Sequence, residues 1–174
     1  MSVAAGSVPD VLPGPDDPPP RVLFCGINPG LTSARTGHHF AKSGNRFWPV
    51  LYFSGFTPRQ FRPDEQWLLA GLGLGITNVV HRASARADEL STAELVAGGE
   101  RLRTLVRTLR PEWLAVVGIG AYRIAFDESR ARVGRQDRTV GDTRIWVLPN
   151  PSGLNAHWSL DQMAAEFARL RESS

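Results

Sequence analysis

Four short apolar runs limit the folds open to this chain more than any other feature of its sequence. Each run is bounded by glycine or proline on at least one side and is short for a buried helix, so each reads as a buried strand. The runs span residues 22–25, 76–80, 113–117 and 144–148. Helix signals separate them, including capping boxes that begin at Ser91 and Ser159. This alternation predicts an α/β fold: a single-domain three-layer α/β/α sandwich with a mostly parallel central sheet.

The length and composition fit one folded domain with a short leader. The chain has 174 residues, 42% of them apolar, which is enough to bury a core. Residues 1–20 contain six prolines among small and acidic residues, which predicts a disordered leader before a domain at 21–174. We expect residues 31–45 to form a long polar loop and residues 127–142 an arginine-rich loop. The arginines of the helix that follows Ser91 are expected to face solvent.

Several classes of protein are excluded by what the chain lacks. Cys25 is the only cysteine and lies in an apolar run, so the sequence predicts no disulfide framework or thiolate cluster. The four histidines lack metal-ligand spacing, and we expect no metal or other cofactor. The absence of a long apolar stretch or signal peptide predicts a cytoplasmic protein with no membrane partner, associated with the nucleoid when it acts on DNA. We expect a monomer.

The charge distribution indicates the kind of partner. The net charge is +3, although the first 20 residues hold three acids and no base. The folded part is therefore more basic than the whole chain, which favours a polyanionic partner.

The turn after the first apolar run presents a polar side chain in a fixed way. It reads Gly26, Ile27, Asn28, Pro29 and Gly30. The glycines permit a close backbone approach, and the proline favours an extended conformation at the asparagine. Ligands of open α/β sheets bind at the carboxyl ends of the strands, where this turn lies. An ordinary strand-to-loop turn is the alternative interpretation.

A second asparagine–proline turn follows the last apolar run. It begins at Asn150 and ends in an apolar residue, Leu154, among polar neighbours. Both turns leave strands at the same edge of the sheet, so they can face each other across one cleft. An exposed leucine beside a pocket suits a wedge that enters DNA while a base is flipped out. The alternative is a hydrophobic staple that packs Leu154 on the final helix.

Three motifs together resemble those of a known family. Residues 26–30, 44–48 and 150–154 are similar to motifs of the mismatch-specific uracil-DNA glycosylases and their thymine-DNA glycosylase relatives, and the similarity extends from about residue 21 to 170. The resemblance implies an enzyme that flips uracil, or a related damaged or mismatched pyrimidine opposite guanine, out of double-stranded DNA. It then hydrolyses the N-glycosidic bond without a cofactor and leaves an abasic site.

The resemblance also assigns roles by position. Asn28 would hold the attacking water, and Gly153 and Leu154 would enter the duplex. Phe40 would stack on the base and offer its backbone N–H, and Ser33 would lie near the C5 edge of the pyrimidine. The other residues expected to line the pocket are Gly26, Ile27, Pro29, Gly30, Asn78 and Asn150. The other residues expected to contact DNA are Lys42, Arg135, Ser152 and Asn155.

One catalytic position raises a chemical question. The more powerful relatives carry aspartate and histidine where this chain has Asn28 and Asn150, and an asparagine cannot accept a proton at neutral pH. The sequence therefore predicts slow turnover and a further carboxylate, for which Asp88 is the candidate. Alternatively, Asp88 only favours the positive end of the following helix. Two other functions remain open: a module that binds damaged bases without cleavage, and a small-molecule nucleobase or nucleotide enzyme.

Overall fold

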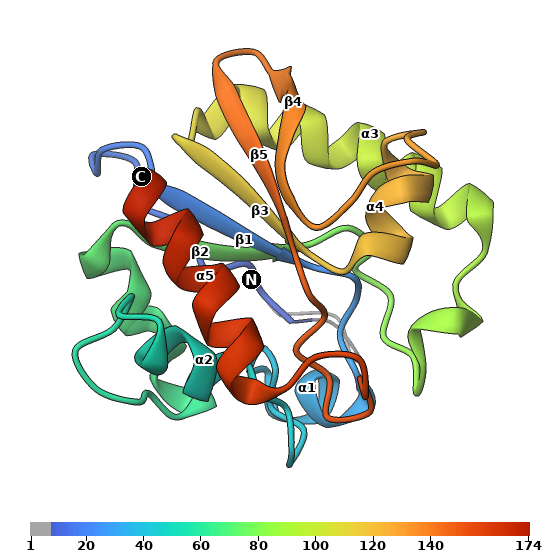
Figure 1. Ribbon diagram of the computed structural model, residues 1–174. Helices are drawn as coiled ribbons and strands as arrows, with labels where there is room; N and C mark the ends of the chain where they lie inside the picture. The colour runs from blue at the N-terminus through green and yellow to red at the C-terminus, as the bar shows by residue number, and fades with distance from the viewer. Residues whose placement is uncertain (1–7) are drawn as a thin grey trace.

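The computed structural model describes residues 8–174, which form a sheet with helices on both faces (Figure 1). The sheet has the strand order β2-β1-β3-β5-β4, in which β4 is antiparallel to β5 and the other neighbours are parallel. The strands are β1 (Val22–Gly26), β2 (Leu74–Asn78), β3 (Trp113–Val117), β4 (Gly134–Val140) and β5 (Thr143–Leu148). The carboxyl ends of β1, β2, β3 and β5 therefore meet at one edge.

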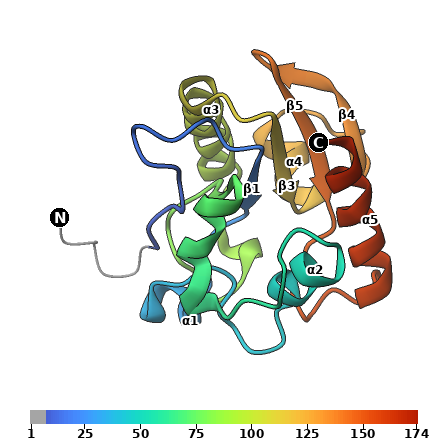
Figure 2. The same cartoon turned by 90° about the vertical axis from the view of Figure 1, so that its left-hand side faces the viewer.

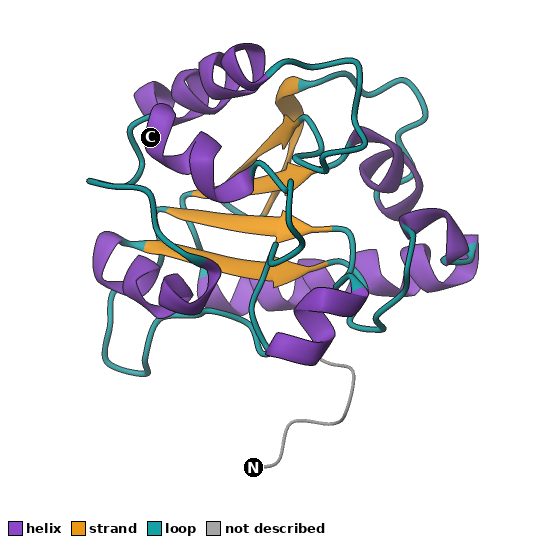
Figure 3. Cartoon of the chain, turned by 90° about the horizontal axis from the view of Figure 1, so that it is seen from below, coloured by secondary structure: helices purple, strands orange, loops and turns teal. Residues whose placement is uncertain are grey.

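The helices form the two outer layers (Figure 3). The elements are α1 (Leu31–Thr36), α2 (Phe47–Phe53), the 3₁₀ segments η1 (Pro63–Leu72) and η2 (Ala87–Glu89), α3 (Thr92–Leu109), α4 (Ile119–Ala125) and α5 (Leu160–Ser173). One face of the sheet packs against η1 and against α2 and α5, which lie side by side (Figures 1 and 2). The other face packs against α3 and α4. Within this part of the chain, no helix combines the length and the apolar character needed to cross a membrane.

Both faces of the central strands are buried, which explains their continuous apolar sequences. In β1, Phe24 contacts the rings of Phe47 and Phe56 at centroid distances of 5.5 and 5.3 Å on one face. Its neighbours Leu23 and Cys25 join the core on the other face. The predicted three-layer α/β/α fold is confirmed, as are the capping boxes at Ser91 and Ser159.

The prediction of disorder over residues 1–20 is wrong for the described part of that segment. Val8 and Val11 are buried, and Val11 exchanges backbone hydrogen bonds of 2.9 and 2.8 Å with Ile76 of β2. The backbone of Val11 pairs with β2, which is the edge strand, and so covers part of an open sheet edge. The side chains of Val8 and Val11 anchor this proline-rich segment in the protein. Residues 1–7 fall outside the described residues.

Two predicted loops contain regular structure. Residues 134–140 form the edge strand β4, which joins β5 through a two-residue turn with Gly141 at φ 58°. Glycine at the first turn position is a hairpin signal that the surrounding arginines obscured. Within 31–45, residues 31–36 form α1, which ends at Gly37 with φ 76°.

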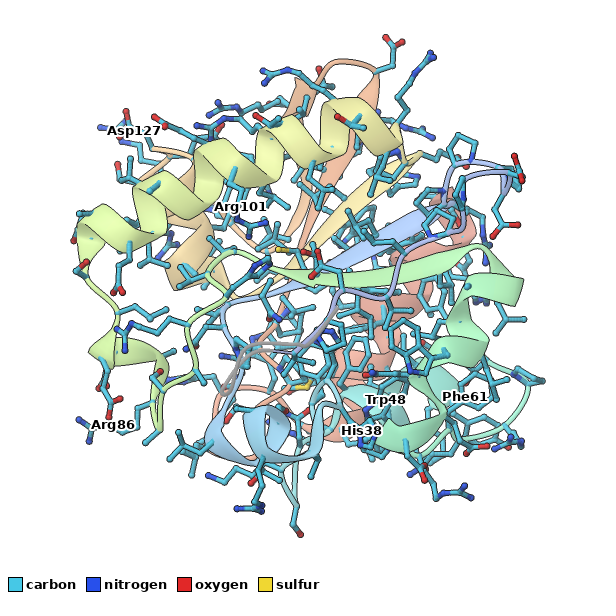
Figure 4. The ribbon with its side chains drawn as sticks, turned by 180° about the vertical axis from the view of Figure 1, so that it is seen from behind. His38, Trp48, Phe61, Arg86, Arg101 and Asp127 are labelled. Carbon is cyan, nitrogen blue, oxygen red and sulfur yellow. The ribbon has the colours of Figure 1, made fainter. Side chains whose placement is uncertain are left out.

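The expectation that the arginines of α3 face solvent is wrong for two of them. Arg101 donates hydrogen bonds to the carbonyl oxygens of Asn78 and Val79 at 2.6 and 2.9 Å, and Arg103 donates to Ala125 O at 3.2 Å. Figure 4 shows Arg101 between α3 and the sheet. These long side chains satisfy backbone carbonyls at the carboxyl ends of β2 and α4, so they serve packing.

Candidate active site

A cleft of about 370 Å³ lies at the carboxyl edge of the sheet. The loops after β1, β2 and β5 line it, so both asparagine–proline turns face the same space. The predicted site residues that line it are Ile27, Asn28, Pro29, Gly30, Ser33, Phe40, Lys42, Asn78, Asp88, Asn150, Ser152 and Leu154. A second hollow of about 720 Å³ shares the lining residues Ile27, Ala87, Asp88 and Asn150 with the cleft. The topology therefore assembles most of the residues selected from the sequence.

The amide of Asn28 has one fixed orientation. Its Nδ2 donates to the carbonyl oxygen of Arg82 at 2.9 Å and to Ser84 Oγ at 2.8 Å. A carbonyl oxygen only accepts, so the group that faces it is the NH₂. Ser84 Oγ in turn donates to the Arg86 carbonyl oxygen at 2.7 Å. The side-chain oxygen of Asn28 accepts no hydrogen bond from residues 8–174 and is left to accept one from a molecule in the cleft.

The floor of the cleft is built from close contacts around Gly26. A Cβ at this position would lie 2.5 Å from Asn78 Oδ1 and 3.2 Å from Phe40 Cζ, so only glycine fits. Phe40 itself stacks on Phe47, with ring centroids 4.0 Å apart and an interplanar angle of 25°. Its φ of 52° is unusual for a bulky residue, and such strain is typical of functional sites. Ser33 is buried beside this strained turn, and its Oγ accepts a hydrogen bond from the Ala41 backbone N–H at 3.2 Å.

Asn78 ends β2 and contacts a buried histidine. Its Nδ2 lies 3.5 Å from Nδ1 of His39, which is itself only 2% exposed and lines the cleft. Burial lowers the pKa of His39 below its usual value, although the hydrogen bond to the Pro9 carbonyl opposes this effect. A neutral imidazole therefore stands behind Asn78.

Arg46 organises the second turn. Its guanidinium donates to the carbonyl oxygens of Trp158, Ser152 and Asn155 at 2.7, 2.8 and 2.9 Å. Its backbone N–H donates to the Pro151 carbonyl oxygen at 2.9 Å. A planar donor with several fixed N–H groups suits these three carbonyl oxygens. Through its side chain and its backbone N–H, Arg46 holds residues 151–158 against the start of α2.

The tip of this turn combines a tight contact with an exposed leucine. A Cβ at Gly153 would lie 2.8 Å from the carbonyl oxygen of Gly44, so glycine allows the two loops to touch. Leu154 is 79% exposed and borders the cleft. The alternative that Leu154 packs on the final helix as a hydrophobic staple is wrong. Asn150 and Asn155 stabilise the turn, because Asn150 Oδ1 accepts from Ser152 N and Asn155 Nδ2 donates to Asn150 O, both at 3.0 Å.

The charged candidates differ in their positions. Asp88 lies in η2 and is the one carboxylate among the described residues that line the cleft. Its side chain is 70% exposed and pairs at 3.1 Å with Arg86, which points outward from the loop (Figure 4). The amide of Asn28 anchors the loop that carries Asp88 by its hydrogen bond to Ser84. The carboxylate in the capping box of α3 is that of Glu94. Exposed Lys42 also lines the cleft.

Arg135 is not brought to the cleft. Its guanidinium lies 5.6 Å from the ring centroid of Trp113, the first residue of β3, which is at the opposite end of the parallel strands. It lines a separate hollow of about 670 Å³ with other arginines of the 127–138 segment. The expectation that Arg135 contacts DNA together with the cleft residues therefore gains no support.

Three residues that sequence reasoning did not select position the site. They are His39, Arg46 and Ser84. His39 directly precedes Phe40, and Arg46 belongs to one of the three motifs. Their position next to predicted site residues in the sequence was the one weak signal for them. Ser84 carried no signal, because its role depends on how the loop after β2 folds back on Asn28.

A comparison with protein families identifies the architecture. The family model described as "Uracil DNA glycosylase superfamily" matches residues 13–172. The match covers all five strands and every residue of the cleft described above.

Proposed function

The chain belongs to the uracil DNA glycosylase superfamily, and we propose that it removes uracil from double-stranded DNA, with a preference for uracil opposite guanine. Membership indicates DNA glycosylase activity, a hydrolysis of N-glycosidic bonds in DNA repair. We further propose that the enzyme prefers mismatches and that it removes the base without cutting the DNA backbone. The observation that carries it is the fixed amide of Asn28, which lines the same cleft as Phe40 and Asn78.

Asn28 is proposed to orient the attacking water. Because its Nδ2 is occupied by Arg82 and Ser84, the side-chain oxygen can accept a hydrogen bond from that water. Orientation alone contributes to the rate by placing the water in line with the bond that breaks. The amide does not take up a proton, so Asp88 is proposed as the carboxylate that accepts it or stabilises the cationic sugar.

The leaving pyrimidine is proposed to receive fixed donors. Cleavage develops positive charge on the sugar, and the departing base carries the negative charge. The Phe40 backbone N–H forms no hydrogen bond with residues 8–174, and Asn78 Nδ2 has a second hydrogen beyond the one that faces His39. Donors that are already in place stabilise the anion without reorganisation during the reaction.

The exposed leucine supports an extended DNA substrate over a free nucleotide. Leu154 borders the cleft at 79% exposure, and an apolar side chain there can fill the space that a flipped nucleotide leaves. Leu154→Ala is expected to lower the single-turnover rate on duplex DNA about tenfold and to change the rate on single strands much less. Leu68→Ala, at a 49% exposed position on η1, is the matched control. Equal losses on duplex and single strand would contradict the wedge.

The experiment that tests the proposal is single-turnover incubation with labelled DNA. The substrates are duplexes with uracil opposite guanine, uracil opposite adenine or thymine opposite guanine, and a uracil-containing single strand. Breaks after alkali in the guanine–uracil duplex, with fewer in the others, are expected. Asn28→Ala should lower the rate by about 10²–10³-fold.

Other outcomes decide against the proposal. Selective binding of the mismatch without cleavage would favour the damage-binding module, in keeping with the two amides at the catalytic positions and the exposed, paired Asp88. Breaks that need no alkali would contradict simple hydrolysis and would implicate Lys42 at the cleft.

A further inference from the structure

The N-terminal segment reaches the cleft through one histidine. Pro9, two residues before the pairing between Val11 and Ile76, places its carbonyl oxygen 2.8 Å from Nε2 of His39. Asp10, between Pro9 and Val11, places Oδ1 3.6 Å from Nε2 of His81. The two residues that follow Pro9 thus attach the segment to the sheet edge, and Val8 before it is buried.

The contact with Pro9 determines which ring nitrogen of His39 carries the proton. A carbonyl oxygen only accepts, so Nε2 must be protonated. Because burial keeps the imidazole neutral, Nδ1 carries a lone pair and can only accept. The backbone of His39 is fixed as well, since its N–H donates to Gln66 Oε1 at 2.8 Å and its carbonyl accepts from Trp48 Nε1 at 3.0 Å.

The lone pair on Nδ1 in turn orients Asn78. At 3.5 Å from Nδ1, the amide group of Asn78 that faces His39 must be the NH₂. Asn78 Oδ1 therefore points toward Gly26 and the ring of Phe40. That oxygen accepts no hydrogen bond from residues 8–174 and is available to a base beside Phe40.

We propose that the Pro9 carbonyl, acting through the tautomer of His39, fixes the Asn78 amide in the orientation that accepts uracil and rejects cytosine. This inference rests on the proposed glycosylase function. It makes residues 8–11 a positioning element for base selection, with Pro9 and His39 as positioning residues.

The chemistry of the two bases explains the selection. Uracil presents an N–H at N3 and a carbonyl at C4, which match an acceptor Oδ1 and a donor Nδ2. Cytosine presents a lone pair at N3 and an amino group at C4, so both contacts become repulsive. A reversed Asn78 amide would exchange these preferences, and discrimination of this kind depends on unpaired polar groups as much as on attraction.

The first test compares two deletions for their selection between bases. Deletion of residues 2–10 removes the Pro9 carbonyl, and deletion of residues 2–7 leaves every described contact and is the control. The probes are duplexes with 2′-fluoro-2′-deoxyuridine or 2′-fluoro-2′-deoxycytidine opposite guanine, which resist cleavage. Cytosine pairs more strongly with guanine than uracil does, which affects how easily each base is flipped out. This difference cancels when the ratio of the dissociation constants for the two duplexes is compared between protein variants. We expect the preference for uracil to fall about tenfold in the longer deletion and to stay unchanged in the shorter one.

The second test uses the full-length chain and remains valid if the longer deletion does not fold. In ¹⁵N-labelled protein, His39 should show the Nε2–H tautomer by NMR, with its signals assigned from their loss in His39→Gln. His39→Asn keeps a polar atom near Asn78 but cannot reach Pro9, so it should lose the same preference for uracil.

The outcomes separate this inference from the proposed function. Full-length protein that cleaves no uracil duplex overturns the function. If it cleaves uracil, an Nδ1–H tautomer of His39, or an unchanged preference in His39→Asn or in a folded 2–10 deletion, overturns the inference alone. A merely structural role of the segment would lower the melting temperature and leave the preference intact.

Discussion

Asn28 Nδ2 donates a hydrogen bond to Ser84 Oγ at 2.8 Å, and this contact joins the turn after β1 to the loop after β2. The loop carries Asp88, so the same bond places the proposed water-holding amide and the cleft carboxylate on one connected unit. The bond is also one of two that orient the amide, the other being that to Arg82. Loss of the Ser84 hydroxyl should therefore weaken the orientation without abolishing it.

Ser84→Ala is expected to lower the single-turnover rate on uracil-containing duplex about three- to tenfold, the size of one hydrogen bond. The effect should be far smaller than that of Asn28→Ala. Ser43→Ala, at an exposed position on a neighbouring loop, is the control. Identical rates for Ser84→Ala and the wild-type chain would show that Arg82 alone fixes the amide.

Gly153→Ala tests the contact between the two loops at the mouth of the cleft. The added Cβ would lie 2.8 Å from the Gly44 carbonyl oxygen, so the 150–155 turn must shift and carry Leu154 with it. We expect at least a tenfold loss of activity on duplex DNA with little change in melting temperature, because a small displacement at a site can cost this much. Gly71→Ala, with no atom within 4 Å of its new Cβ, should change neither quantity.

Glu94 links acid stability to the site. Its pKa is lowered to about 2, first by the hydrogen bond from Arg82 and next by the Ser91 backbone N–H. A carboxyl whose pKa is lower in the folded state stabilises that state above its unfolded pKa, and this contribution is lost as the pH falls from about 4.5 toward 2. Glu94→Gln should therefore flatten the pH dependence of unfolding in this range.

A second glutamate separates stability from activity. Glu65, in η1 and not among the residues that line the cleft, also has its pKa lowered to about 2, chiefly by Arg59. Glu65→Gln should flatten the same acid transition and leave the excision rate unchanged. Glu94→Gln should in addition slow excision, because Arg82 supplies the carbonyl oxygen that holds Asn28. Equal excision rates in the two variants would contradict this link, and chemical denaturation at several pH values measures the stability part.

The sequence was most informative for strands that are buried on both faces of the sheet. The central strands are covered on both faces, so runs such as that in β1 are continuously apolar and were predicted. The edge strand β4 is buried only at its two ends and alternates exposed and half-buried residues between them, and its arginines hid the pattern. The pairing of Val11 was missed because one residue among prolines contacts a strand far along the chain. Such a contact has no local sequence pattern.

The site followed a similar division. Residues in the two asparagine–proline turns were predicted together because parallel strands bring their carboxyl ends to one edge. The contacts of Arg46 and His39 were not predicted, because their acceptors are backbone carbonyls of Ser152, Trp158 and Pro9. Any residue supplies a carbonyl, so side-chain identity gives no indication of these bonds.

Lys42 and Arg135 give opposite expectations for DNA binding. Exposed Lys42 lines the cleft, whereas the Arg135 guanidinium lies over Trp113 at the far end of the parallel strands. Each phosphate contact contributes about one unit to the slope of log affinity against log salt concentration. Lys42→Gln should therefore reduce the slope by about one and weaken all sequences similarly, and Arg135→Gln should leave the slope unchanged.

Fluorescence anisotropy of an uncleavable duplex at several salt concentrations measures both slopes. If Arg135→Gln reduces the slope and Lys42→Gln does not, the phosphates contact the arginine-lined hollow at 127–138, and the expected phosphate contact of Lys42 at the cleft is wrong. If both variants reduce it, the duplex contacts both ends of the sheet. Because Leu154 and Lys42 line the same cleft, a change confined to Lys42→Gln would place the phosphate backbone at the cleft that carries the proposed wedge.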